Sequence, residues 1–495
     1  MPDPGPGGPA GDVAEALAPV GAPVGAPVGA PSGPHAPAAL AAATPAPVPT
    51  PEEARFVTGS TLRHVAVMTA TGAVGLMAVF AVDLLSLFYI ARLGDPRLTA
   101  AVGFASVIQF FAVSVNVGLM IAVGALVSRS IGAGERALAR RLAGSACALL
   151  VVAAALVSGA IALVLGPALA ALGADAETAG LARHFLLIAL PSNPLMALGM
   201  AYTGALRAVG DASRAMSVTL AGAIVTAGLD PLLIFGLDLG LTGAASAIVV
   251  ARVVFVAVGW RGAVVRHDLV ARPAPSTVLA DADPILRIAV PAVLTSLAPA
   301  VAGAFFAGVL ARSGTAVVAA NAIIDRLVPV AFGGLFALSG AVGPILGQNW
   351  GAGRFDRMRA TLLDSARFAA AYVAVIWLAL ALGRGFVVQG FGIAGEAADL
   401  VAFFCLVGGG LWFFNGLLFV ANAAFNNLGF PLVSTLFNWG RATAGTVPFA
   451  LAGAALAGPK GAFLGVGAGS VIFGTWALAE AFRRIAGLAR EGRRG

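Results

Sequence analysis

Twelve long apolar stretches, separated by short polar breaks, constrain the fold of this chain more than any other feature. The stretches lie at about 62–91, 98–128, 138–165, 181–207, 214–236, 241–262, 284–311, 315–347, 360–383, 397–426, 431–456 and 461–482. Each exceeds the roughly 20 residues that a helix needs to cross the core of a bilayer. None shows the two-residue alternation of a transmembrane strand. The sequence therefore predicts an all-α integral membrane protein with twelve transmembrane helices.

Basic residues are distributed unequally between the two ends of these stretches. Twenty lie at the termini and in loops after even-numbered stretches, and only six lie in loops after odd-numbered stretches. These six are Arg92, Arg97, Arg183, Arg312, Arg384 and Lys460. Because cytoplasmic loops of membrane proteins are rich in Lys and Arg, both termini are predicted to be cytoplasmic. We expect a multi-pass protein of a bacterial-type cytoplasmic (inner) membrane.

The same distribution accounts for the net charge of +7, so no nucleic-acid partner is expected. Only 11% of the residues are charged, against roughly 25% in soluble domains, which makes the lipid bilayer part of the solvent. Cys147 and Cys405 each lie alone in an apolar stretch, so the sequence predicts neither a disulfide framework nor a metal site.

Composition also divides the chain into segments. Residues 1–55 are rich in Pro, Ala and Gly and poor in residues that pack a core, so they are predicted to form a disordered tail. An N-terminal six-helix half is expected at 56–262 and a C-terminal six-helix half at 284–485. A cytoplasmic linker at 263–283 joins them, and a basic tail follows at 486–495.

The two halves repeat one another at a nearly constant offset in the residue numbering. The matching landmarks are Gly132-Ala133-Gly134 with Gly351-Ala352-Gly353, Arg92-Leu93-Gly94 with Arg312-Ser313-Gly314, Gly210 with Gly429, and Gly243 with Gly461. Because six stretches separate equivalent positions, both halves cross the membrane in the same direction. This pattern predicts two parallel pseudo-repeats around a central cavity, which is an architecture of secondary transporters.

Four segments carry a family likeness: VDLLSLFYIARLG at 82–94, SIGAG at 130–134, GLDPLLIFGLDLGLTGAASA at 228–247 and GQNWGAG at 347–353. Together they resemble the multidrug and toxic compound extrusion (MATE) transporters, and within them the DinF-like branch. The resemblance implies an antiporter in which entry of protons, or alternatively of sodium ions, drives the export of bulky, often cationic amphipathic drugs or metabolites. It implies no cofactor and no obligatory protein partner.

The resemblance also implies a coupling site in the first half. In the DinF-like branch an Asp in the first helix and an Asn-x-x-x-Asp pattern in the fifth make the cation site. Asp83 and Asp230 match the two acids, and Thr226 stands where the Asn is expected. A carboxylate in lipid is kept only if it is paired, protonated or in contact with water, which makes it a candidate proton carrier. We expect Asp83 to carry the coupling proton and Asp230 to hold it in place.

Other polar residues inside the stretches are candidates for the substrate cavity, although each could equally join neighbouring helices. These candidates are Asn116, Asn193, Tyr202, Asp325, Arg441, Asn415 and Asn422. No catalytic residue is expected.

Two other functions are compatible with a polytopic chain. A lipid-linked saccharide flippase of the same superfamily usually has more spans and more cations facing its cavity. A membrane-embedded enzyme would need a cluster of catalytic residues, whereas His35, His64, His184 and His267 are scattered. Both interpretations fit the sequence less well than a cation-coupled antiporter.

Overall fold

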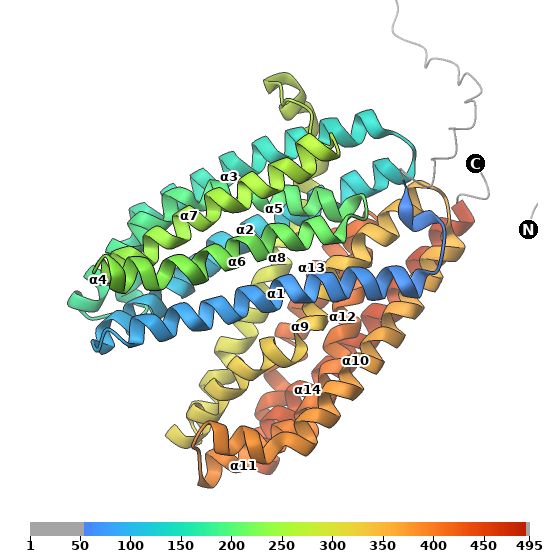
Figure 1. The fold of residues 1–495 in the computed structure, drawn as a ribbon. Helices are drawn as coiled ribbons and strands as arrows, with labels where there is room; N and C mark the ends of the chain where they lie inside the picture. Colours follow the sequence, from blue (N-terminus) through green and yellow to red (C-terminus); the bar gives the residue numbers. More distant parts are fainter. Residues whose placement is uncertain (1–53, 492–495) are drawn as a thin grey trace, which may run out of the picture. The chain divides into compact units, whose positions relative to one another are not determined.

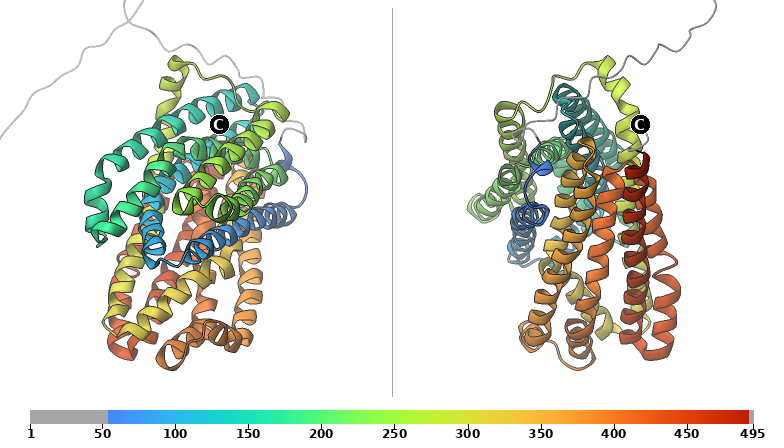
Figure 2. Two further views of the ribbon diagram at one scale, coloured as in Figure 1. Left: turned by 60° about the vertical axis from the view of Figure 1, so that its left-hand side comes forward. Right: turned by 90° about the vertical axis from the view of Figure 1, so that its right-hand side faces the viewer.

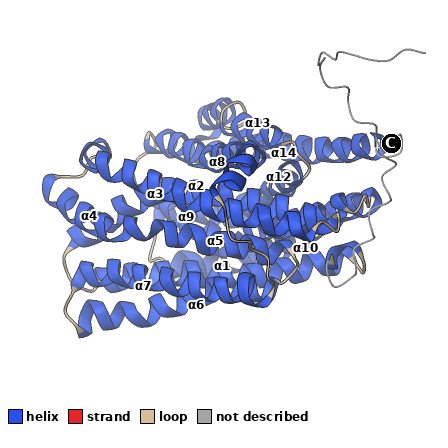
Figure 3. Ribbon diagram, turned by 90° about the horizontal axis from the view of Figure 1, so that it is seen from above, coloured by secondary structure: helices blue, strands red, loops and turns tan. Residues whose placement is uncertain are grey.

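The computed structural model describes residues 54–491, and in this range the chain is a bundle of helices without any strand (Figures 1 and 3). The all-α prediction is therefore confirmed. The predicted disordered tail at 1–55 lies outside the described residues except for its last two positions, and so do the final four residues of the predicted basic tail.

The first half contains six membrane crossings. Its helices are α1 (Thr61–Ala91), α2 (Pro96–Gly132), α3 (Arg136–Ala171), α4 (Ala176–Ala189) continued by α5 (Asn193–Ala208), α6 (Ala212–Pro231) with the π-helix η3 (Leu232–Gly236), and α7 (Gly240–Trp260) with the π-helix η4 (Arg261–Arg266). Aspartates cap several of these helices, because a carboxylate before the first turn accepts free backbone N–H groups. Asp175, for example, accepts from the backbone N of Glu177 and Thr178 at 3.1 and 3.0 Å.

The second half repeats this order. Its helices are α8 (Pro275–Ala311), α9 (Thr315–Gly351), α10 (Phe355–Gly390), α11 (Gly395–Phe403) continued through the π-helix η5 (Phe404–Gly408) into α12 (Gly409–Asn427), α13 (Pro431–Ala442) and α14 (Val447–Glu491). Helices α10, α12 and α14 stand side by side in this half (Figure 2).

The segment Pro431–Glu491 makes two crossings, although it counts as one of eleven long apolar helices in the described range. Its 61 residues would extend about 90 Å as one helix, three times the thickness of a bilayer core. The helix breaks at Ala457 and Gly458, where φ of the glycine is 61°. The two flanks then pack against each other in antiparallel directions. A Cβ added at Gly453 would meet the backbone of Gly461, one at Gly465 would meet that of Phe449, and one at Gly469 would meet that of Gly445. The prediction of twelve transmembrane helices is confirmed.

The segment between the halves contains more helix than its composition suggests. Only His267–Ala274 lies outside helices, because α8 begins at Pro275 instead of near residue 284. The added turns are anchored to α3. Asp281, which is 3% exposed, accepts a hydrogen bond from Ser145 at 2.7 Å and pairs with Arg141 at 3.0 Å.

The two repeated glycine loops meet each other at one end of the bundle. We call this the basic end; it carries the start of α1, the end of α14 and most basic residues. A Cβ on Gly132 would lie 2.1 Å from the carbonyl oxygen of Gln348, and a Cβ on Gly351 would lie 2.1 Å from that of Arg129. Gly351 and Gln348 are the repeat equivalents of Gly132 and Arg129, so the halves meet through matching contacts about a pseudo-twofold axis.

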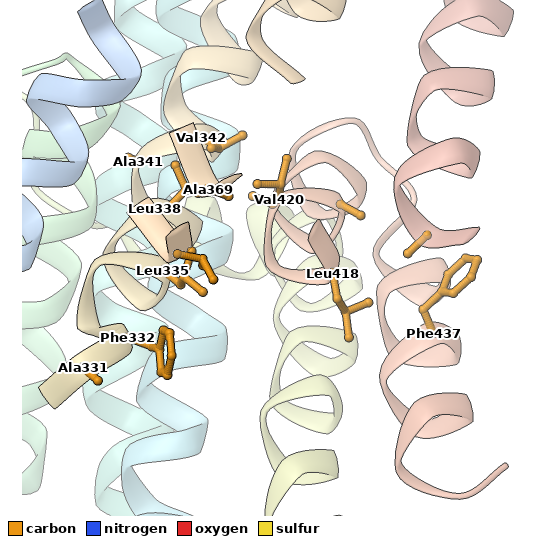
Figure 4. Close-up of a cluster of buried hydrophobic side chains, with 14 of the residues drawn as sticks. Ala331, Phe332, Leu335, Leu338, Ala341, Val342, Ala369, Leu418, Val420 and Phe437 are labelled. Carbon is orange, nitrogen blue, oxygen red and sulfur yellow. The ribbon is translucent and has the colours of Figure 1, made fainter. Parts of the chain in front are cut away.

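The halves are in contact at the basic end and apart at the opposite, distal end. In α9 nearly every residue from 331 to 349 is buried, whereas most residues from 311 to 319 are exposed. A kink at Phe332 (φ −108°, ψ 17°), three residues after Pro329, separates these parts. Phe332 stacks on Trp412 and begins the buried stripe that faces α10 and α12 (Figure 4). The halves therefore diverge toward the distal end (Figure 1).

Candidate functional site

A buried carboxylate lies where α6 meets α1. Asp230 is 1% exposed and occupies the last turn of α6, directly before Pro231 and the π-helix η3. Ser86 of α1 donates a hydrogen bond to Asp230 Oδ2, while Asp230 Oδ1 is buried without a partner among the described residues. π-helical turns often mark functional sites because they widen the helix and free backbone groups. Sequence reasoning missed Ser86, which is one of many hydroxyls in the chain.

Asp83 lies one helical turn before Ser86 on α1, so both project toward the same side of the helix. Its side chain is exposed, in contrast to that of Asp230, and the two carboxylates are close enough for their charges to interact. The structure thus brings the two predicted acids together. It buries Asp230, however, which was expected to play the supporting part, and exposes Asp83.

Thr226 is half-buried one turn before Asp230 on α6. Its hydroxyl donates to the carbonyl oxygen of Gly222 in the same helix at 3.1 Å. The hydroxyl is therefore engaged within its own helix and forms no hydrogen bond with either acid in this conformation.

Three of the predicted cavity residues join helices inside their own halves. Asn116 of α2 donates to Asn193 at the start of α5 at 2.9 Å, and both are at most 1% exposed. Asn422 of α12 shares hydrogen bonds with Asn438 and Ser434 of α13 at 2.8–3.3 Å. These amides stabilise helix packing.

The other predicted cavity residues are scattered. Tyr202 is 7% exposed and packs on Gly259 of α7. Asn415 is half-buried in α12 and forms no side-chain hydrogen bond with a described residue. Asp325 is exposed on the distal part of α9, where it accepts from Asn321 at 2.9 Å. Arg441 of α13 has only a long contact to Ser470, at 3.5 Å.

The contact between the halves at the basic end uses residues in and beside the two repeated glycine motifs. Gln348 donates to the carbonyl oxygen of Ala208 at 2.6 Å and accepts from the backbone N of Phe56 at 2.9 Å. The guanidinium of Arg129 lies 3.5 Å from the ring centroid of Trp350 and donates to the carbonyl oxygen of Asn427 at 3.0 Å. The repeated motifs therefore hold the two halves together.

A carboxylate also anchors the loop between α5 and α6 at this end. Asp211 accepts a hydrogen bond from His267 Nε2 at 2.7 Å and forms an ion pair with Arg214. Burial by itself would raise the pKa of Asp211, but the hydrogen bonds from His267 and Arg214 outweigh burial and lower the pKa. Asp211 is therefore a charged, structural group at neutral pH.

A small pocket of about 60 Å³ lies between the halves on the pseudo-twofold axis. Its first-half lining comes from α2 and α5, and its second-half lining from α9 and α12. Six lining residues of the first half each have their repeat equivalent in the lining as well. These pairs are Met120 with Ser339, Ile121 with Gly340, Gly124 with Gly343, Ala125 with Pro344, Gly204 with Ala423, and Arg207 with Asn426.

Comparisons with known proteins agree with this architecture. The MatE family model matches residues 73–232 and 291–451. The second matched segment follows the first at the offset of the internal repeat, so the family model matches corresponding parts of the two halves. An FAD transporter of Shewanella oneidensis is 28% identical over 414 residues, which cover 82% of this chain and 91% of that protein.

Solved structures share the fold. The MATE transporter VcmN of Vibrio cholerae in its bent form superposes with a TM-score of 0.82 at 25% identity, covering 86% of this chain and 98% of that one. A multidrug resistance MATE family transporter in an outward-facing conformation gives a TM-score of 0.83 at 20% identity over 89% of this chain and 99% of that one. The family match spans more than half of the chain and the fold agrees, so this chain belongs to the MatE family and is a membrane transporter, not an enzyme.

Proposed function

We propose that this transporter is a proton-coupled antiporter that exports bulky amphipathic organic molecules. The observation that carries the proposal is the buried carboxylate of Asp230, held by Ser86 beside the exposed Asp83. Because the basic end is predicted to be cytoplasmic, halves that diverge at the distal end correspond to an outward-facing state. Protons from outside would then meet Asp83 first.

Protonation has a large energetic consequence at Asp230. A charged carboxylate at the centre of a membrane helix costs roughly 3 kcal/mol, which corresponds to about a hundredfold change in an equilibrium constant. Removing that charge changes the relative energies of two packings of α1 against α6. A proton exchanged between Asp83 and Asp230 can therefore bias the equilibrium between outward-facing and inward-facing states.

The burial of Asp230 supports giving this residue the larger role, which reverses the order proposed from sequence. Asp83, being exposed, would take up the proton, and Asp230 would convert its neutralisation into a change of helix packing. Helix α1 is suited to transmit this change, because it packs on α6 of its own half and on α9 of the other (Figure 1).

A flavin nucleotide is a second candidate substrate beside the bulky drugs that the family resemblance implies. The observation in its favour is the similarity over most of the chain to an FAD transporter. FAD is bulky and amphipathic, as the proposed substrates are.

Transport by purified protein in liposomes tests the proposal, with pH and sodium gradients imposed separately and with ethidium and FAD as substrates. We expect a pH gradient to drive substrate movement. Asp230→Asn should reduce gradient-driven movement by at least about tenfold. Asp83→Asn should also slow it, but less.

Asp283→Asn is a matched control, because Asp283 is an exposed acid whose ion pair with Arg287 lies outside the proposed site. It should transport like the parent protein. Equal pH-driven transport by the parent and Asp230→Asn would refute the coupling role of Asp230. Transport driven only by sodium would identify sodium as the coupling ion instead.

A further inference from the structure

The pocket on the pseudo-twofold axis contains a cation that has no counter-charge. Arg207 of α5 forms no side-chain hydrogen bond or ion pair with any residue in the range 54–491, and no acid lines the pocket. Its guanidinium reaches across to the second half: a Cβ on Gly340 of α9 would lie 2.5 Å from Arg207 Nη1. An isolated charge between packed helices is costly unless a partner of opposite charge joins it.

The facing residue also lacks a partner. Asn426 of α12, the repeat equivalent of Arg207, is 3% exposed, and its side chain makes no hydrogen bond to another described residue. Its buried, unpaired oxygen Oδ1 is an acceptor, so the group that it leaves for an anionic ligand is the donor Nδ2. The pocket therefore holds two donors, one from each half, that are not engaged by any described residue.

Arg252 of α7, another arginine within the first half, has hydrogen-bond acceptors for its guanidinium. It donates to the carbonyl oxygen of Ala189 at 2.7 Å, to Ser192 Oγ at 2.8 Å and to Gln109 Oε1 at 3.2 Å. The carbonyl oxygen of Ala189, at the start of the 3-10 turn Leu190–Ser192, also accepts from Ser192 Oγ at 2.7 Å. Arg252 is thus a structural arginine, and Arg207 differs from it in having no such set of acceptors.

We propose that the pocket between Arg207 and Asn426 binds an oxyanion group of the transported substrate, so that the substrates are anionic amphipathic molecules. This inference rests on the proposed transport function and names its substrate class. The Arg207 guanidinium supplies the charge and two parallel N–H donors, which match the geometry of phosphate or carboxylate. The Asn426 amide donates from the opposite half. A volume of about 60 Å³ has room for such a group while the rest of the molecule lies between the diverging halves.

The arrangement also explains how the substrate would favour closure of the basic end. Arg207 and Asn426 can hold one oxyanion only when the halves are together. Binding energy that requires both halves stabilises the closed basic end relative to the open one. An anionic substrate entering from that end would therefore promote closure behind itself.

Binding of FAD and riboflavin to the purified full-length chain tests the proposal, because the two share the flavin ring and only FAD carries a pyrophosphate. We expect the parent protein to bind FAD at least about tenfold more tightly than riboflavin. Arg207→Gln should lose that advantage without changing riboflavin binding, whereas Arg207→Lys should retain part of it. Inorganic phosphate should compete with FAD in the parent and not in Arg207→Gln.

Arg384→Gln is the control, because Arg384 lies in α10 toward the distal end and donates only to the carbonyl oxygen of Ala381. It should bind both flavins like the parent. Thermal unfolding of each variant in detergent verifies that it is folded. A parent that binds FAD no better than riboflavin, or an Arg207→Gln variant that keeps the full preference, overturns the proposal.

The two proposals fail separately in these experiments. If the parent moves ethidium under a pH gradient but shows no preference for FAD, the antiport mechanism stands and the oxyanion pocket does not. If the parent binds FAD through Arg207 but no gradient drives its movement, the pocket stands and proton-coupled antiport does not.

Discussion

The two halves share one helix order but differ in the polarity of their interiors. In the first half, two apolar clusters occupy the distal and basic ends. Polar groups including Asn116, Asn193 and Arg252 lie between them. In the second half, one continuous apolar cluster runs through most of the length, around α9 and α12 (Figure 4). The first half is therefore divided by polar groups in its middle, whereas the apolar cluster of the second half is continuous.

The internal repeat shows which residues of the second half occupy the positions equivalent to the two acids of the first half. The positions equivalent to Asp83 in the second half are Val301, Ala302 and Gly303, allowing for the small variation in the offset, and those equivalent to Asp230 are Pro448, Phe449 and Ala450. None of these six residues can bind a proton. The backbone repeat thus preserves helix packing and the axial pocket, while the pair of acids at Asp83 and Asp230 has no equivalent in the second half. We infer that proton coupling is a property of the first half.

The largest effect is expected from a comparison of acids between the halves. Asp230→Asn should reduce pH-driven transport by at least about tenfold, whereas Asp325→Asn should leave it within about twofold, because Asp325 is exposed and its side chain hydrogen-bonds only Asn321 among the described residues. Transport in liposomes with matched protein abundance measures both. Equal losses in the two variants would remove the functional distinction between the halves.

A symmetric effect is expected where the halves meet. Gly132→Val and Gly351→Val would each place a side chain against the backbone of the other half, at a distance where nothing can move aside. Overpacking of this kind costs typically about 1–3 kcal/mol, so each should slow transport by about tenfold or more. Gly103→Ala on the same helix as Gly132 has open space around it and should be neutral. Unequal losses in the two valine variants would show that the pseudo-symmetry does not extend to function.

A moderate loss of stability is expected from the amide network of the second half. Asn438→Ala removes two hydrogen bonds to Asn422 and should lower the free energy of unfolding by roughly 1–3 kcal/mol. The repeat equivalent, Thr219, donates only within its own helix to Met216, so Thr219→Val should cost less. Thermal unfolding in detergent compares the two. A larger loss for Thr219→Val would contradict the structural role assigned to the amides.

The smallest effect is expected at Asp211, whose repeat equivalent is the apolar Phe430. The pKa of Asp211 is lowered in the folded state, so its ionisation stabilises the fold above the unfolded pKa of about 3.9 and ceases to do so as pH falls through the folded value. Asp211→Asn should therefore lower stability by about 1 kcal/mol at pH 7, and by progressively less as pH falls through the lowered pKa of Asp211. Unfolding midpoints across this pH range measure the difference. A difference independent of pH would mean that charge is not the cause.

Several features of the fold were predictable because they depend on residues close in sequence. Helix α1 begins at Thr61 and ends at Ala91, as its apolar stretch predicts, and the other crossings agree to within several residues except at the end of α14 and the start of α8. That start was missed because its extra turns depend on the contacts of Asp281 with Ser145 and Arg141, which lie in α3. Local composition contains no information about such partners.

By itself the sequence determined the twelve crossings and the parallel repeat, because apolar length, glycine position and repeat offset are properties of the chain alone. The pairing of Asp83 with Asp230 was an expectation from the family resemblance. Only the tertiary structure decided that Asp230 is buried while Asp83 is exposed, and that Arg207 and Asn426 face one pocket. The physical reason is that burial and charge pairing depend on which distant helices pack together. Residues that are one full repeat apart in the sequence become neighbours only when the two halves close on their common axis.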